Sequence, residues 1–132
     1  MHAKGTFEVK ITPQTPDSKF EDSTMGRMTI DKQFHGDIEG SSKGEMLSAM
    51  TEVKGSAGYV AMERVTGKVQ GRTGGFVLQH SATMNRGVPQ LSITVVPDSG
   101  TGQLVGITGK MDIIINAGQH SYDFAYTLPP AQ

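Results

Sequence analysis

Much of the chain alternates between apolar and polar residues. Apolar side chains occupy every second position of 6–11, and the ranges 27–39 and 120–128 alternate in the same way. Successive side chains of a β-strand point to opposite faces, so this pattern predicts strands with one buried face. Lys32 interrupts the apolar set of 27–39, and we expect its long stem to carry the charge out to solvent.

The range 58–84 predicts a β-hairpin, since two β-rich runs flank the glycine-dense segment 71–75. If Gly71 and Arg72 are the central residues of a type II′ turn, Glu63 lies opposite His80 and Tyr59 lies opposite Met84 on one face. A slip of two residues would keep this face and change the partners, whereas a slip of one would reverse the face.

The remaining segments predict more strands and few helices. The range 40–55 fits both a helical and a strand spacing, and we favour a strand because the segment lacks a clear helix cap. Two further strands are predicted at 91–96 and 104–116, and a polar loop is predicted at 14–24. The 17 glycines are typical of a fold with many short turns.

About eight strands joined by short turns predict an all-β protein. Consecutive strands connected in this way are antiparallel neighbours, and eight of them can close into a barrel that has no free edge. We therefore predict a single closed antiparallel β-barrel domain over residues 1–132, with a two-sheet β-sandwich as the alternative.

Composition argues against several classes of protein. The chain has no cysteine, so disulfides and thiolate chemistry are excluded. Its 13 acidic and 12 basic residues nearly cancel without a basic run, which argues against nucleic-acid binding. No apolar run reaches the roughly 18 residues of a membrane span, and the first residues lack the apolar stretch of a signal peptide. We expect a cytoplasmic protein without a membrane partner.

Metal and cofactor motifs are also missing. The four histidines stand at positions 2, 35, 80 and 120 without the close spacing of common metal sites. We therefore expect no metal and no cofactor, and we expect His35 to lie on the surface. The segment 40–44 formally matches the Gly-x-Ser-x-Gly pattern of serine hydrolases. That motif requires a strand-to-helix elbow in an α/β sheet, so we interpret Ser42 as a turn residue.

Several ionisable side chains fall on the apolar faces of the predicted strands. They are Glu63, His80 and His120, together with Glu45 if 40–55 is a strand, and Tyr59 joins them with its hydroxyl. Because a buried carboxylate needs a partner, His80 is the natural donor for Glu63. This pair could act as an acid and a base at the mouth of a cavity. Alternatively, it could fix the strand register or lie at a solvated barrel rim.

Five blocks of sequence carry a family resemblance. They are Gly58-Tyr-Val-Ala-Met-Glu-Arg-Val-Thr-Gly, Gly75-Phe-Val-Leu-Gln-His-Ser, Pro97-Asp-Ser-Gly-Thr-Gly-Gln-Leu-Val-Gly-Ile-Thr-Gly, Lys32-Gln-Phe-His-Gly-Asp-Ile-Glu-Gly and His120-Ser-Tyr-Asp-Phe-Ala-Tyr-Thr-Leu. Through them nearly the whole chain resembles the bacterial domain-of-unknown-function 3224 (DUF3224) family. The resemblance implies the lipocalin-like closed barrel of plant allene oxide cyclase, and self-association as in that oligomeric enzyme. It implies no activity, and no catalytic residue of the cyclase can be aligned with this chain.

Three functional hypotheses follow. The first is a binding module for a small apolar or amphipathic molecule, whose polar end would be oriented by Tyr59, Glu63 and His80, with His120 and Glu45 as further candidates for the binding site. The second is an enzyme of the isomerase or cyclase type, with Glu63 and His80 as catalytic acid and base. The third is a structural barrel whose interior is filled by side chains.

Overall fold

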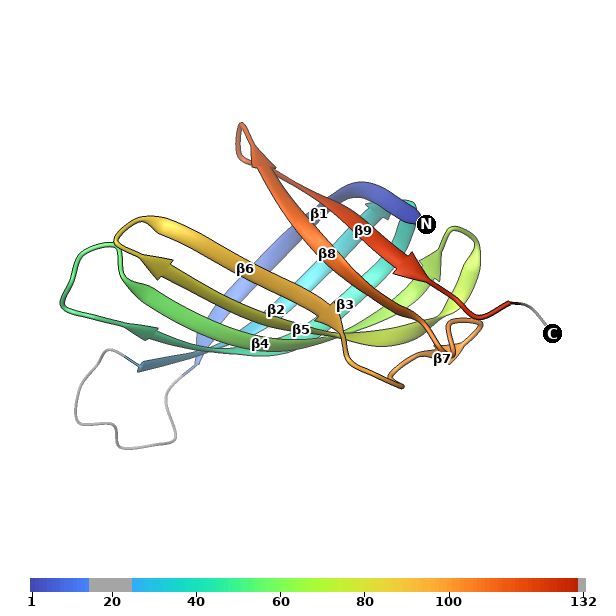
Figure 1. The fold of residues 1–132 in the computed structure, drawn as a ribbon, viewed down its shortest axis with the longest axis horizontal. Helices are drawn as coiled ribbons and strands as arrows, with labels where there is room; N and C mark the ends of the chain where they lie inside the picture. The colour runs from blue at the N-terminus through green and yellow to red at the C-terminus, as the bar shows by residue number, and fades with distance from the viewer. Residues whose placement is uncertain (15–24, 131–132) are drawn as a thin grey trace.

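The protein is described here by a computed structural model that covers residues 1–14 and 25–130. The polar loop predicted at 14–24 lies outside these ranges except for Gln14. The described residues form nine β-strands and no helix (Figure 1). The strands are β1 (His2–Gln14), β2 (Met25–Gly36), β3 (Ile38–Met50), β4 (Ala57–Val69), β5 (Arg72–Asn85), β6 (Val88–Val95), β7 (Thr101–Gly102), β8 (Thr108–Asn116) and β9 (Gln119–Thr127).

Eight of the strands close into an antiparallel barrel. Their order around the barrel is β1, β2, β3, β4, β5, β6, β8 and β9, and β9 pairs back with β1. The short β7 adds to β5 at Gly74 and Gly75. The barrel prediction is thus confirmed, and the sandwich alternative is wrong. The described ranges contain no helix that is long and apolar enough to cross a membrane.

The ambiguous segment is a strand, as favoured from the sequence. β3 pairs along its length with β2 on one side and with β4 on the other. Its inward-facing positions include Ser42, Gly44 and Met46, whereas Glu45 and Leu47 are exposed. The alternation of β3 therefore has the opposite phase to the one expected when Glu45 was assigned to the apolar face.

The hairpin of β4 and β5 turns at Gln70 and Gly71, one position earlier than predicted. Both residues have positive φ angles, 47° and 86°, as in a type I′ turn rather than type II′. Glu63 is consequently opposite Leu78, and His80 is opposite Ala61. The predicted opposition of Glu63 and His80 is wrong by two residues, a slip that leaves both side chains on the same inner face.

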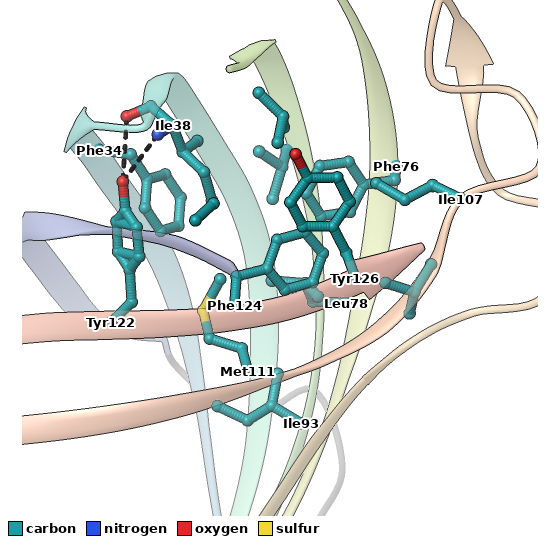
Figure 2. Close-up of a cluster of buried hydrophobic side chains, with 14 of the residues drawn as sticks. Phe34, Ile38, Phe76, Leu78, Ile93, Ile107, Met111, Tyr122, Phe124 and Tyr126 are labelled. Atoms are coloured by element: carbon teal, nitrogen blue, oxygen red, sulfur yellow. Dashed lines mark hydrogen bonds between the residues drawn. The ribbon is translucent and has the colours of Figure 1, made fainter. Parts of the chain in front are cut away.

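One end of the barrel is filled by aromatic side chains (Figure 2). The rings of Phe76 and Phe124 stack at 5.4 Å between centroids, and Tyr126 stacks on Phe124 at 5.2 Å. The hydroxyl of Tyr122 accepts a 2.8 Å hydrogen bond from the amide of Ile38, so this buried polar group is satisfied. Burial raises the pKa of Tyr122 to about 12. We call this end the closed end.

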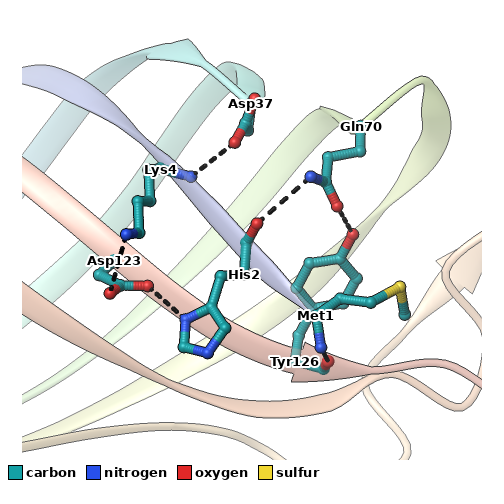
Figure 3. Close-up of polar contacts among 7 residues, drawn as sticks. All are labelled: Met1, His2, Lys4, Asp37, Gln70, Asp123 and Tyr126. Atoms are coloured by element: carbon teal, nitrogen blue, oxygen red, sulfur yellow. Dashed lines mark hydrogen bonds and ion pairs between the residues drawn. The ribbon is translucent and has the colours of Figure 1, made fainter.

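The first residues of the chain are held at the closed end by polar contacts (Figure 3). The amino group of Met1 donates to the carbonyl of Tyr126 at 3.0 Å. The side chain of Gln70 joins β1 to β9, because its amide donates to the carbonyl of His2 and its carbonyl accepts from the hydroxyl of Tyr126. These contacts tie the hairpin turn at Gln70 to β1 and β9.

The opposite end of the barrel is open, and it carries the connections that follow β3, β5 and β8 (Figure 1). Inward-facing side chains become more exposed along each strand toward this end. Exposure rises from 0% at Leu78 to 42% at Met84 in β5, from 2% at Ile93 to 45% at Leu91 in β6, and from 3% at Met111 to 66% at Ile115 in β8. The interior is thus packed in one half and accessible in the other.

Candidate functional site

Four polar side chains are buried where the packed half of the barrel meets the open half. Lys32, Ser42, Glu63 and His80 come from β2, β3, β4 and β5, which are consecutive strands of the barrel. Among the described residues, these four are the buried polar or charged side chains. Burial of charge is costly unless each group is paired, so each charged member of the cluster needs a partner within it.

Glu63 is the centre of this polar cluster. Its Oε1 accepts hydrogen bonds from Nζ of Lys32 at 3.0 Å and from Nε2 of His80 at 2.6 Å. Its Oε2 accepts from the hydroxyl of Ser42 at 2.5 Å. Both carboxylate oxygens are therefore occupied from within the barrel wall.

The strand registers explain how these four residues meet. Lys32 is the Cα partner of Ser42, and Glu63 is the partner of Gly44. A Cβ atom at Gly44 would lie 2.7 Å from Cα and 2.9 Å from Cβ of Glu63. Glycine at this position lets β3 approach β4 closely, and the carboxylate of Glu63 reaches diagonally past it to Ser42 and Lys32.

Glu63 is ionised despite its burial. Burial raises the pKa of its carboxyl group, but the hydrogen bond from His80, the charge of Lys32 and the hydrogen bond from Ser42 together outweigh it and lower the pKa to about 2. At neutral pH the cluster contains a buried carboxylate whose acceptor capacity is used by three donors.

Above the cluster lies a cavity of about 190 Å³, a space equivalent to roughly six waters at ~30 Å³ each. Its polar lining consists of Lys32, Tyr59, His80 and His120. Its apolar wall includes Val9, Ile30, Met46, Leu91, Ile113 and Ile115. Since Leu91 and Ile115 are exposed at the open end, the cavity opens to solvent there.

The second ring nitrogen of His80 is accessible. A carboxylate only accepts hydrogen bonds, so Nε2 carries the proton that His80 shares with Glu63. Within the described residues Nδ1 of His80 makes no hydrogen bond, and no buried side-chain nitrogen or oxygen there lacks a partner. Nδ1 must therefore reach accessible space, and inside the barrel that space is the cavity.

The structure brings four of the five candidate residues together. Glu63 and His80 are in direct contact, whereas Tyr59 and His120 are half-buried and line the cavity. The ring of His120 lies 5.2 Å from that of Phe7. Burial, and then the charge of Glu63, raises the pKa of Tyr59.

The fifth candidate, Glu45, does not belong to the cavity. It is exposed on the outside of β3, where its Oε1 accepts a 2.6 Å hydrogen bond from Nη2 of Arg27. The assignment of Glu45 to the inner face was wrong because Gly44 and Met46, on either side of it, are the inward residues.

Two residues of the cluster were misjudged from the sequence. Lys32 does not extend to solvent: it is buried, and its Nζ lies 4.9 Å from the ring centroid of Phe7. Ser42 is a strand residue that binds Glu63, not a turn residue. The interruption of an apolar face by Lys32 was the available signal, since a lysine on such a face needs an acidic partner if it is buried.

Other polar groups lie apart from the cavity. His35 is on the outside, as expected, where Nε2 contacts Oε2 of Glu8 at 2.9 Å. In the ranges 1–14 and 25–130, no group of three or more histidine, aspartate or glutamate side chains is placed to hold a metal ion.

Comparison with known proteins gives a consistent family assignment. The family model described as "Protein of unknown function (DUF3224)" matches residues 3–126. A crystal structure of a protein with unknown function from the DUF3224 family of Shewanella oneidensis MR-1, at 1.84 Å resolution, is 50% identical, with a TM-score of 0.93 over 99% of this chain and 98% of that chain. No curated protein matches. The chain therefore belongs to the DUF3224 family.

Proposed function

We propose that the protein binds a small apolar or amphipathic molecule in the open half of its barrel. The observation that carries this proposal is the division of the interior: aromatic rings fill one half, and inward-facing apolar residues line an accessible cavity in the other. A barrel that served only as a scaffold would gain stability from filling both halves, because each buried apolar side chain contributes to folding.

The mouth of the cavity favours apolar ligands. Ile11, Leu91 and Ile115 point inward but are 46%, 45% and 66% exposed. Exposed apolar surface that continues into a cavity is typical of a binding site rather than of an ordinary surface. A ligand in this position would remove these side chains from water.

Two of the strands that line the cavity are joined by few backbone contacts. β6 and β8 share a single register pair, Thr94 with Lys110, and the two strands separate from there toward the open end (Figure 1). Leu91 of β6 and Ile113 of β8 line the cavity where these two strands are not paired. A ligand can therefore contact both strands without breaking a β-ladder between them.

A second candidate function is catalysis of the isomerase or cyclase type. The favouring observation is the arrangement of His80, whose Nε2 is held by Glu63 while Nδ1 faces the cavity. An imidazole oriented by a carboxylate is a common general base. In this scheme Glu63 would be a positioning residue, and His80 would move the proton.

Native mass spectrometry of protein purified gently from its own host tests the binding proposal. We expect one stoichiometric small molecule, which denaturation then releases for identification. Protein that carries no molecule, and that also fails to bind eight-carbon amphiphiles in calorimetry, would contradict it. Turnover of the identified molecule that is lost in His80→Gln would favour catalysis over binding alone.

A further inference from the structure

We propose that the cavity selects ligands whose polar end is a carboxyl group, held by Lys32 and His80. This inference rests on the proposed binding function and specifies the class of ligand. The cavity lining is asymmetric in charge: it contains a basic residue and no acidic one. The polar residues there are one lysine, two histidines and one tyrosine, whereas Glu63 is 0% exposed behind them.

Lys32 has unused donor capacity beside the cavity. Its ammonium has three N–H groups, and in the described part of the chain one of them is accounted for by the bond to Glu63. The rings of Phe7 and Phe34, with centroids 4.9 Å and 5.9 Å from Nζ, provide further electrostatic contact but accept no conventional hydrogen bond. A ligand oxygen near Nζ would accept a hydrogen bond from one of the two remaining N–H groups.

His80 supplies the second contact. Nζ of Lys32 and Nε2 of His80 bind the same oxygen of Glu63, so the two side chains lie next to each other at the cavity floor. Nδ1 of His80 can accept a proton from a carboxylic acid, or donate to a carboxylate once it is protonated. One carboxyl group can therefore engage both residues.

The charge balance supports the same ligand class. Lys32 and Glu63 offset each other when His80 is neutral. A carboxylate that enters together with one proton on His80 leaves two positive and two negative charges, each with an opposite neighbour. An alkylamine would instead bring a second ammonium next to Lys32. An alcohol would be accepted, but without the charge-assisted hydrogen bonds that a carboxylate makes.

Calorimetry with octanoate, 1-octanol and octylamine at neutral pH tests this inference, since the three compounds share an eight-carbon chain. We expect octanoate to bind at least about tenfold more tightly than 1-octanol, the difference expected for charge-assisted hydrogen bonds. Octylamine should bind more weakly than either. Affinity for 1-octanol or octylamine that equals or exceeds the affinity for octanoate would overturn the inference and leave the binding function intact. Binding of none of the three would overturn the inference, and it would also contradict the binding function if the protein carries no molecule from its host.

Variants locate the head-group site. In Lys32→Met the preference for octanoate over 1-octanol should disappear, whereas Lys43→Met, on the exposed outer face of β3, should retain it. If Lys32→Met fails to fold because the buried Glu63 loses its counter-charge, the double variant Lys32→Met/Glu63→Gln removes both charges together. A double variant that folds and still prefers octanoate tenfold would refute the assignment of the carboxyl group to Lys32.

Discussion

Nε2 of His80 donates a 2.6 Å hydrogen bond to Oε1 of Glu63, although the two residues are not opposite each other in their hairpin. His80 is opposite Ala61, and Glu63 is opposite Leu78. The contact is therefore diagonal across β4 and β5. The side chain of Ala61, opposite His80, is too small to block it. The same carboxylate also binds Lys32 and Ser42, so one residue of β4 connects four strands.

Replacing Glu63 should destabilise the barrel strongly. Glu63→Gln leaves the buried ammonium of Lys32 without its counter-charge, a change that typically costs about 3–5 kcal/mol of unfolding free energy. Urea denaturation of the wild type and the variant measures this loss of unfolding free energy. The matched control is Glu45→Gln, which breaks the exposed pair with Arg27 and should cost less than about 1 kcal/mol. Equal effects of the two substitutions would show that the buried cluster is not a stabilising contact.

The contribution of Glu63 should depend on pH in the acid range. Its pKa falls from 4.5 to about 2 in the folded protein. Because the folded pKa is depressed, the stabilisation is complete above about pH 4.5 and is lost as the pH falls toward 2. The difference in unfolding free energy between the wild type and Glu63→Gln should therefore shrink as the pH falls from about 4.5 toward 2, the window set by those two values. A difference that stays constant over this window would contradict an ionised Glu63.

Gly44 should tolerate no side chain. An alanine Cβ at this position would lie 2.1 Å from the carbonyl oxygen of Met62 and would press on the backbone of Glu63. We expect Gly44→Ala to cost at least about 1–3 kcal/mol, as overpacking does. Gly58→Ala, on the neighbouring strand β4, is the control, because its nearest contact would be an ordinary 3.5 Å. Thermal unfolding of both variants measures the difference in stability. A Gly44→Ala protein as stable as Gly58→Ala would refute the close approach of β3 and β4.

Filling the cavity should abolish ligand binding. Leu91→Trp adds an inward ring at the open end, where Leu91 lines the cavity and is 45% exposed, so the substitution should fold. Ser92→Trp places the same ring on the opposite face of β6 and serves as the control. We expect calorimetry with octanoate to show at least a tenfold loss of affinity for Leu91→Trp and no loss for Ser92→Trp. Unchanged affinity in Leu91→Trp would place the ligand elsewhere.

The sequence predicts the barrel because alternation is a property of each strand alone. The alternating segments assigned Phe34, Ile38 and Tyr122 to inner faces, and all three are buried. The register of the central hairpin was harder to predict. It depends on Gln70 adopting a positive φ, and no glycine marks that position, whereas Gly71 and Arg72 offered an equally plausible turn.

Of the four residues in the buried polar cluster, only Glu63 and His80 could be predicted, for a similar reason. Glu63 and His80 stand on clearly alternating strands, so their shared face could be deduced. In the middle of β3 the inward residues are Ser42, Gly44 and Met46, and two of them are small, so the apolar signal pointed to the wrong face and to Glu45. The burial of Lys32 depends on a carboxylate supplied by β4, a partner 31 residues away that local patterns do not reveal.

A small molecule in the open half of the barrel would change the environment of the side chains that line the cavity. The most direct test follows the isoleucine methyl signals by NMR during a titration with octanoate, repeated with 1-octanol. Ile113 lines the cavity, whereas its neighbour Ile114 is exposed on the other face of β8. We expect saturable shifts of Ile113 and Ile30 and no shift of Ile114, because the ligand binds inside the open half. Unshifted Ile113 signals with both compounds, or equal shifts of Ile113 and Ile114, would contradict it.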